Sequence, residues 1–217
     1  MKKSLKAQAI DDIRSRILSG EYAPGTDLSE LSLCESLGMS RTPIREALLV
    51  LQNEGLIEIV ANKGARVTKL ERDDIIKLGQ VREVLEVMVL RLSFNKISRD
   101  LLRDRLNDIE SELQYVEQNP DFDIPSDRFS NTNRIHSDLL SAAKNEYLTK
   151  MYESIVSQIT RVTALSRHAR SYKRVLLEHK RIIESILNEN QIEAETAIQE
   201  HIHEAIFSLL TRDYDIS

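Results

Sequence analysis

Between residues 40 and 55, apolar and polar positions alternate with the period of an α-helix. The apolar positions are spaced i, i+3, i+4 and i+7 and share one face, at Ile44, Ala47, Leu48 and Leu51. Ser40 or Thr42 can cap this helix, and Gly55 can end it in a left-handed conformation. Another face carries polar and positive side chains near its start, at Arg41, Thr42 and Arg45. This combination suits a helix that lies in a groove of DNA. An amphipathic core helix would show the same period, so the neighbouring segments must decide between the two interpretations.

Two more helices are predicted ahead of this one. Residues 5–19 place most of their apolar side chains on one side, and the turn-rich residues 20–25 end that helix. Residues 28–37 form a short second helix, which Gly38-Met39 connects tightly to the helix described above. Two helices joined by a tight turn that contains glycine are typical of a helix-turn-helix, whose second helix enters the major groove of DNA.

The segment after the third helix predicts a β-hairpin. Residues 56–60 and 65–68 are short β-prone runs, and turn-forming residues separate them. The hairpin is interpreted as a wing, with Lys63 and Arg66 near its tip. It can be purely structural, but asparagine, lysine and glycine at the tip favour a contact with phosphate or the minor groove. Residues 1–70 are therefore predicted to form a winged helix-turn-helix domain.

From residue 71 onward the apolar period is helical, and glycine and proline are scarce. The predicted helices lie near residues 71–95, 101–116, 127–143, 146–168, 171–188 and 191–212. We therefore expect a mainly α fold: a winged helix-turn-helix domain whose small β-hairpin is the only sheet, followed by an all-α antiparallel helical bundle in residues 71–217.

Composition places the chain among ordinary globular proteins. Its 217 residues are 41% hydrophobic and 30% charged, and no apolar run reaches the length of a membrane span. No apolar segment follows the N-terminal lysines, as it would in a secretory signal. We expect a cytoplasmic protein, and the single cysteine agrees with this. Cys34 has no second cysteine to pair with, so we expect it to be a buried small side chain rather than a redox sensor.

The net charge of −5 argues against nucleic acid as a partner until its distribution is considered. Residues 1–69 hold 10 Lys and Arg against 9 Asp and Glu, whereas the remainder holds 20 against 26. A near-neutral N-terminal domain, whose cations gather at helix starts and at the wing, can bind DNA as a dimer with a strong dependence on salt.

Three histidines of the second half occupy comparable positions on their helices. His179 precedes Asn188 by nine residues and His201 follows Asn190 by eleven, so an antiparallel hairpin brings both side chains to nearly the same level. His136 stands beside apolar residues on a separate helix and can also point inward. Any one of them alone is more often a core or surface residue. Together, three neutral imidazoles inside a bundle can bind a divalent metal ion and leave positions open for water or a ligand.

Arg82 lies on the apolar face of the helix predicted for residues 71–95. It can form a salt bridge with Glu86, one helical turn away. An arginine on a core-facing stripe is costly to bury unpaired, however, and it suits a carboxylate ligand, which is the role we favour. His168 and His203 lie off the inward face or near a loop, and we expect both to be solvated.

The N-terminal residues resemble the winged helix-turn-helix domain of GntR-family bacterial transcription regulators. The resemblance covers residues 5–69 and rests on Pro24-Gly25, residues 37–48 (LGMSRTPIREAL), Glu54-Gly55-Leu56 and Asn62-Lys63-Gly64. It implies contacts to operator phosphates and base edges from Ser40, Arg41, Thr42 and Arg45. It also implies that Gly64 lets the wing approach the duplex.

The remainder resembles the FCD ligand-binding domain of the FadR subfamily. The matching runs are residues 81–86 (VREVLE), 135–140 (IHSDLL), 144–148 (KNEYL), 178–183 (EHKRII) and Glu200-His201. The resemblance implies that one divalent metal ion is held by His136, His179 and His201. Zinc is expected first, with nickel or manganese as alternatives.

In metal-binding members of that subfamily, an Asp or Asn stands four residues before the first histidine and contributes an oxygen ligand. This chain has Thr132 there, and threonine is a poor neutral ligand. Three alternatives follow: the metal keeps three histidines plus water, or Asn133 substitutes, or the site is empty and hydrogen bonds hold the cavity.

These observations lead to an expected function. We expect a homodimer whose winged domain binds a double-stranded DNA operator and whose helical domain binds a small carboxylate effector beside the metal. The resemblance implies repression that the ligand relieves. One alternative is a metal-responsive regulator without an organic effector. Another is a metal-dependent hydrolase, but no H-E-x-x-H helix or paired carboxylates accompany the histidines, so we do not expect an enzyme.

Overall fold

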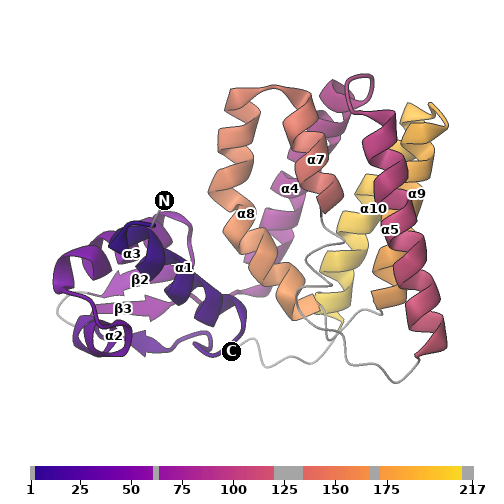
Figure 1. Cartoon of the computed structure of the whole chain (residues 1–217). Coiled ribbons are helices and arrows are strands. Elements are labelled where there is room, and N and C mark those ends of the chain that lie inside the picture. Colours follow the sequence, from indigo (N-terminus) through magenta and orange to yellow (C-terminus); the bar gives the residue numbers. More distant parts are fainter. Residues whose placement is uncertain (1–2, 61–63, 120–133, 167–171, 212–217) are drawn as a thin grey trace. The chain divides into compact units, whose positions relative to one another are not determined.

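The computed structural model describes residues 3–60, 64–119, 134–166 and 172–211. Within these ranges the chain divides into two compact units (Figure 1). The first contains the described residues up to Leu78 together with Glu153–Ala164. The second contains the described residues within Gly79–Tyr152 and from Leu165 onward.

The helix-turn-helix and its wing lie in the first unit. The helices are α1 (Leu5–Leu18), α2 (Glu30–Leu37) and α3 (Arg41–Asn53), and the strands are β1 (Asp27–Leu28), β2 (Ile57–Val60) and β3 (Gly64–Val67). The apolar face predicted for α3 is buried, and α1 and α2 both pack against this helix. Burial of that face leaves the charged side of α3 exposed.

Local signals in the sequence set the ends of α2 and α3. The Ser29 hydroxyl accepts a hydrogen bond from the backbone N–H of Ser32 and caps α2. Gly38 ends α2 with a φ of 63°, and Gly55 follows α3 with a φ of 70°, both in the left-handed region that glycine favours. Ser40 stands at the N-cap position of α3, but the side-chain capping bond that the sequence suggests is not formed.

The sheet contains one strand that the sequence analysis does not predict. Strand β1 pairs with β3, so the predicted hairpin is part of a three-stranded sheet, which is the one sheet within the described residues. Two residues are too few to show a recognisable alternation of apolar and polar positions. Glycine permits this pairing, because a Cβ at Gly64 would lie 2.5 Å from the carbonyl oxygen of Leu28.

The helices that follow confirm the mainly α fold. They are α4 (Arg72–Ser93), α5 (Arg99–Gln118), α7 (Arg134–Ala143), α8 (Glu146–Ser166), α9 (Tyr172–Leu187) and α10 (Gln191–Leu210). Helix α9 packs against both α5 and α10. The predicted helix near residues 127–143 is described only from Arg134 onward. No helix in the described ranges combines the length and the apolar character that a membrane span requires.

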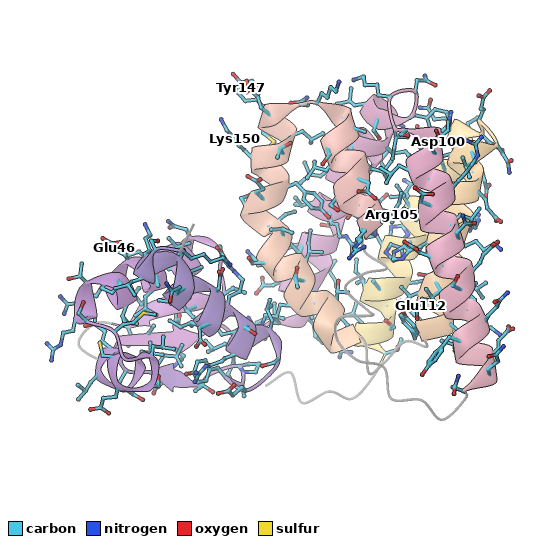
Figure 2. All side chains as sticks on the ribbon, viewed as in Figure 1. Glu46, Asp100, Arg105, Glu112, Tyr147 and Lys150 are labelled. Carbon is cyan, nitrogen blue, oxygen red and sulfur yellow. The ribbon has the colours of Figure 1, made fainter. Side chains whose placement is uncertain are left out.

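Helix α7 is anchored in the bundle by apolar and charged contacts. Ile135 and Leu139 are buried in the same core as α9 and α10. Arg105 on α5, labelled in Figure 2, donates a hydrogen bond from Nε to the carboxylate of Asp138 at 2.7 Å. These contacts fix the direction of the inward face of α7, which carries His136.

Candidate functional site

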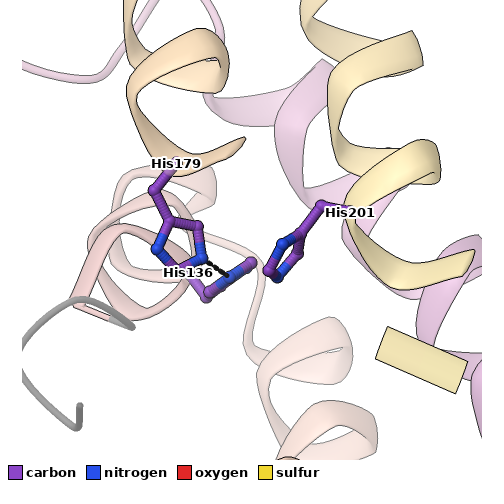
Figure 3. A group of neighbouring side chains, drawn as sticks. All are labelled: His136, His179 and His201. Carbon is purple, nitrogen blue, oxygen red and sulfur yellow. Dashed lines mark hydrogen bonds between the residues drawn. The ribbon is translucent and has the colours of Figure 1, made fainter. Parts of the chain in front are cut away.

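His136, His179 and His201 meet inside the bundle, from α7, α9 and α10 (Figure 3). All three side chains are buried, and the ring nitrogens that they offer lie within 4.8 Å of one another. Nε2 of His136 is 3.2 Å from Nε2 of His179. The structure therefore brings together the three histidines that the sequence spacing places at one level.

The local sequence explains why each imidazole points inward. His179 and His201 lie on the buried stripes of α9 and α10, which the short turn at Asn188–Asn190 joins. His136 lies between the buried residues Ile135 and Leu139 on α7. Apolar packing of the three helices thus determines where the three rings converge.

Two carboxylates orient two of the rings. Nδ1 of His136 lies 2.8 Å from Oε2 of Glu86 on α4, and Nδ1 of His201 lies 2.8 Å from Oε2 of Glu178 on α9. A ring whose Nδ1–H faces a carboxylate has Nε2 as its ligand atom. Nε2 is therefore the nitrogen that each of these two rings could offer to a shared metal ion.

Glu86 is the centre of a buried network. Its Oε1 accepts hydrogen bonds from Nε of Arg82 at 2.7 Å and from the hydroxyl of Tyr152 at 3.1 Å. Burial raises the pKa of Glu86, but the positive charge of Arg82, with a smaller contribution from His136, outweighs burial and holds this pKa well below its usual range. Burial, together with the nearby carboxylate, raises the pKa of the Tyr152 hydroxyl. Glu86 is therefore ionised and Tyr152 neutral at neutral pH.

Arg82 makes the salt bridge with Glu86 that their spacing of one helical turn allows. Arg82 is only 7% exposed, and its Nε is engaged by the carboxylate. Pairing does not exclude the ligand-binding role, because the terminal guanidinium nitrogens are further donors. Contact between Arg82 and a carboxylate ligand stays a prediction.

The roles of Tyr152 and Glu178 in this site cannot be read from the sequence. Glu178 directly precedes His179, but its carboxylate reaches His201 on the neighbouring helix. The only signal was an acidic residue beside an inward histidine, and it does not reveal which ring the acid meets. Tyr152 is 66 residues from Glu86 and left no sequence signal.

The described residues predicted to contact DNA lie on the surface of the first unit. Ser40, Arg41, Thr42 and Arg45 are exposed at the start of α3, and Gly64 and Arg66 lie on β3. Two of these residues hold ion pairs: Arg45 with Glu30, and Arg66 with Asp27.

The other residues singled out in the sequence lie outside the described ranges or away from the three histidines. Lys63, Thr132, Asn133 and His168 lie outside the described residues. His203 is exposed, as expected, and its Nε2 is 2.8 Å from a carboxylate oxygen of Glu83. Cys34 is half-buried and packs against the core of the first unit.

Comparison with known proteins assigns the chain to a family. Residues 5–67 match the bacterial regulatory proteins of the gntR family, and residues 77–204 match the FCD domain. The chain therefore belongs to the GntR family of bacterial regulators that carry an FCD domain. It is a DNA-binding transcriptional regulator and not an enzyme, as the sequence predicts.

Similar proteins span most of the chain. The HTH-type transcriptional regulator LutR of Bacillus subtilis is 28% identical over 208 residues, which cover 86% of this chain and 92% of LutR. The gluconate operon transcriptional repressor of Bacillus licheniformis is 28% identical over 182 residues, 81% of this chain and 72% of that protein. The solved structure of E. coli McbR/YncC has a TM-score of 0.77 at 20% identity and covers 96% of this chain and 98% of its own. This structural likeness concerns the fold alone.

Replacing either member of the buried pair is expected to destabilise the protein. Glu86→Gln leaves the Arg82 guanidinium buried without a charged partner. Arg82→Met leaves the Glu86 carboxylate buried without its positively charged partner. Each is expected to lower the free energy of unfolding by about 3–5 kcal/mol. The double variant is expected to lose less than the sum, with a coupling energy of at least about 1 kcal/mol in urea denaturation of the full chain.

The matched control is another i,i+4 pair in the bundle, between Lys180 and Glu184 on α9, with nitrogen and oxygen 3.6 Å apart. This pair is more exposed, so its coupling energy is expected to stay below about 0.5 kcal/mol. Similar coupling energies in the two cycles would show that burial of Glu86 does not strengthen its dependence on Arg82.

Proposed function

We propose that this protein is a homodimeric repressor whose affinity for a double-stranded operator is controlled by a small carboxylate metabolite bound beside a divalent metal ion. One observation carries the proposal: the same chain combines an exposed, cationic start of α3 with three buried imidazoles that face one another. We place its action in the cytoplasm, where bacterial operators are found.

The operator is contacted by the start of α3 and by the wing. The contacting residues are Ser40, Arg41, Thr42, Arg45, Lys63, Gly64 and Arg66. Hydroxyls and guanidinium groups at a helix start donate hydrogen bonds to phosphates and base edges, and the positive end of the helix dipole adds to the attraction. Gly64 has no side chain that would hold the wing away from the duplex.

The three imidazoles suit a divalent metal ion. Two of them have a carboxylate at Nδ1, which is the usual outer partner of a metal-binding histidine. Three neutral nitrogen ligands with open positions are typical of zinc sites, and nickel or manganese are the alternatives. Water, Thr132 or Asn133 completes the coordination.

A carboxylate effector suits the open positions of such an ion. The ligands are neutral imidazoles, and the charges of Glu86 and Glu178 are already balanced by Arg82 and Arg174, so the ion brings an uncompensated positive charge into a buried site. An anionic oxygen compensates this charge, and the terminal nitrogens of Arg82 offer it further donors. The similarity to a repressor named for a gluconate operon supports both repression and this class of effector, since gluconate is a carboxylate.

A homodimer suits both the helix-turn-helix domain and the helical domain. Helix-turn-helix proteins read two half-sites as symmetric dimers. One side of α4 carries exposed apolar residues at i, i+3 and i+7, which are Val81, Val84 and Met88. We propose that this face packs against the same face of the partner, because exposed apolar stripes mark interaction surfaces.

Val84→Glu is expected to convert the dimer into a monomer, because it places a charge in the centre of the proposed interface. Sedimentation equilibrium of the full chain measures the mass. The control is Ile192→Glu on α10, which changes an equally prominent apolar side chain, 81% exposed against 70% for Val84. A dimer that survives Val84→Glu but dissociates in the control would place the interface elsewhere.

Metal binding is tested through the histidines. Each of the replacements His136→Ala, His179→Ala and His201→Ala is expected to lower the metal content and the melting temperature, because a ligand that binds only the folded state stabilises it. The three losses should not add, since removal of one ligand already disables the site. Elemental analysis of protein purified without chelator or metal resin gives the content.

His203→Ala is the matched control, because this histidine also lies on α10 but is exposed and paired with Glu83. It is expected to retain the metal. Wild-type protein that contains no metal and cannot be loaded with zinc, nickel or manganese would refute the metal site and leave the operator contacts standing.

A further inference from the structure

Two of the arginines assigned to DNA are held by acidic side chains from one short segment, residues 27–30. Glu30 begins α2 and pairs with Arg45 on α3, whereas Asp27 on β1 pairs with Arg66 on β3. Strand β1 is hydrogen-bonded to β3, and α2 packs against α3. The segment therefore joins the two elements that carry the proposed DNA contacts.

Both ion pairs engage Nε of the arginine, but they differ in their use of the terminal nitrogens. Both carboxylate oxygens of Glu30 accept a hydrogen bond from Nε of Arg45, each at 2.9 Å. Asp27 accepts from Nε of Arg66 at 2.7 Å and also from Nη2 at 3.3 Å. Glu30 thus engages Arg45 at Nε and leaves its two terminal nitrogens to another partner, whereas Asp27 takes up one terminal nitrogen of Arg66.

A guanidinium group with both terminal nitrogens available matches one base edge in the major groove. Guanine presents O6 and N7 side by side, and these accept a bidentate pair of hydrogen bonds from arginine. A hydrogen bond at Nε fixes the plane of the Arg45 guanidinium group before DNA binds. This lowers the conformational entropy that is lost on binding. The Arg45 side chain is 61% exposed at the polar face of α3, so a base can reach it.

The carboxylate also affects contacts with the DNA backbone. A negative charge beside Arg45 repels phosphates, which supply most of the attraction to non-operator DNA. A base edge carries no formal charge and is repelled less. Glu30 therefore favours base contact over phosphate contact by the same arginine.

We propose that Glu30 is a positioning residue that presents Arg45 to a guanine of the operator and weakens its use on random DNA. This inference rests on the proposed contact between Arg45 and the operator. It assigns different tasks to the two arginines, because the pairing of Arg66 with Asp27 suits a single contact to phosphate or the minor groove.

The test uses the full-length protein and a pool of randomised DNA duplexes. Wild type, Glu30→Gln, Glu30→Asp and Arg45→Ala each select bound sequences from the pool. Fluorescence anisotropy then measures affinity for the duplex selected by the wild type, for versions with each guanine changed to adenine, and for an unselected duplex. The control is Asp11→Asn on α1, which removes the same charge from another exposed ion pair, with Lys3 at 2.7 Å.

We expect the wild type to prefer guanine at one position of each half-site by about 5- to 150-fold, the discrimination of a bidentate contact. Arg45→Ala is expected to abolish this preference. In Glu30→Gln the preference for guanine should fall at least about threefold. This variant should also bind the unselected duplex about two- to tenfold more tightly, because one negative charge is removed. Asp11→Asn should leave the preference unchanged.

Glu30→Asp separates orientation from charge. Its carboxylate keeps the charge but is one methylene too short to hold Nε, so the guanine preference should fall while affinity for the unselected duplex stays. An unchanged preference in both Glu30 variants, with loss of preference in Arg45→Ala, would overturn the inference and leave the operator contact intact. Wild-type affinity for every duplex in Arg45→Ala would instead refute the proposed contact itself.

Discussion

A buried carboxylate is tolerated only when charged and polar partners surround it, and the arrangement of the helical unit depends on one such group, Glu86. Its oxygens face Arg82 on the same helix, Tyr152 on α8 and His136 on α7. These helices must therefore meet at one point. Because the same carboxylate lies 2.8 Å from Nδ1 of His136, the network that joins these helices also includes a candidate metal ligand.

The proposed sites use one physical device in both units. A carboxylate holds one edge of a nitrogen-bearing group and leaves the opposite edge to an outside partner. Glu86 and Glu178 lie at Nδ1 of two imidazoles, whose Nε2 atoms are the proposed metal ligands. Glu30 stands behind the guanidinium of Arg45, with the terminal nitrogens left for a base. Orientation by a neighbouring acid lowers the ordering cost in each case.

Features that depend on local periodicity could be predicted from the sequence. The buried face of α3 and the level of His179 and His201 follow from the helical repeat and from the position of one turn. Features that depend on pairing between distant segments could not be predicted from the sequence. Strand β1 is too short to show a pattern, and the contact between Tyr152 and Glu86 joins residues 66 positions apart. Glu178 shows the same limit, since its neighbour in sequence is not its partner in space.

Control of operator affinity by the three imidazoles is tested most directly by one titration. Anisotropy of a selected operator duplex is recorded with chelator-treated protein, after addition of zinc, and after addition of zinc with each of a panel of small carboxylates. With zinc and the effector carboxylate we expect affinity to change by about 5- to 150-fold, the range given by a coupling of about 1–3 kcal/mol. The same additions should leave His179→Ala unchanged. Equal operator affinity of the wild type under all of these conditions would contradict control through this site.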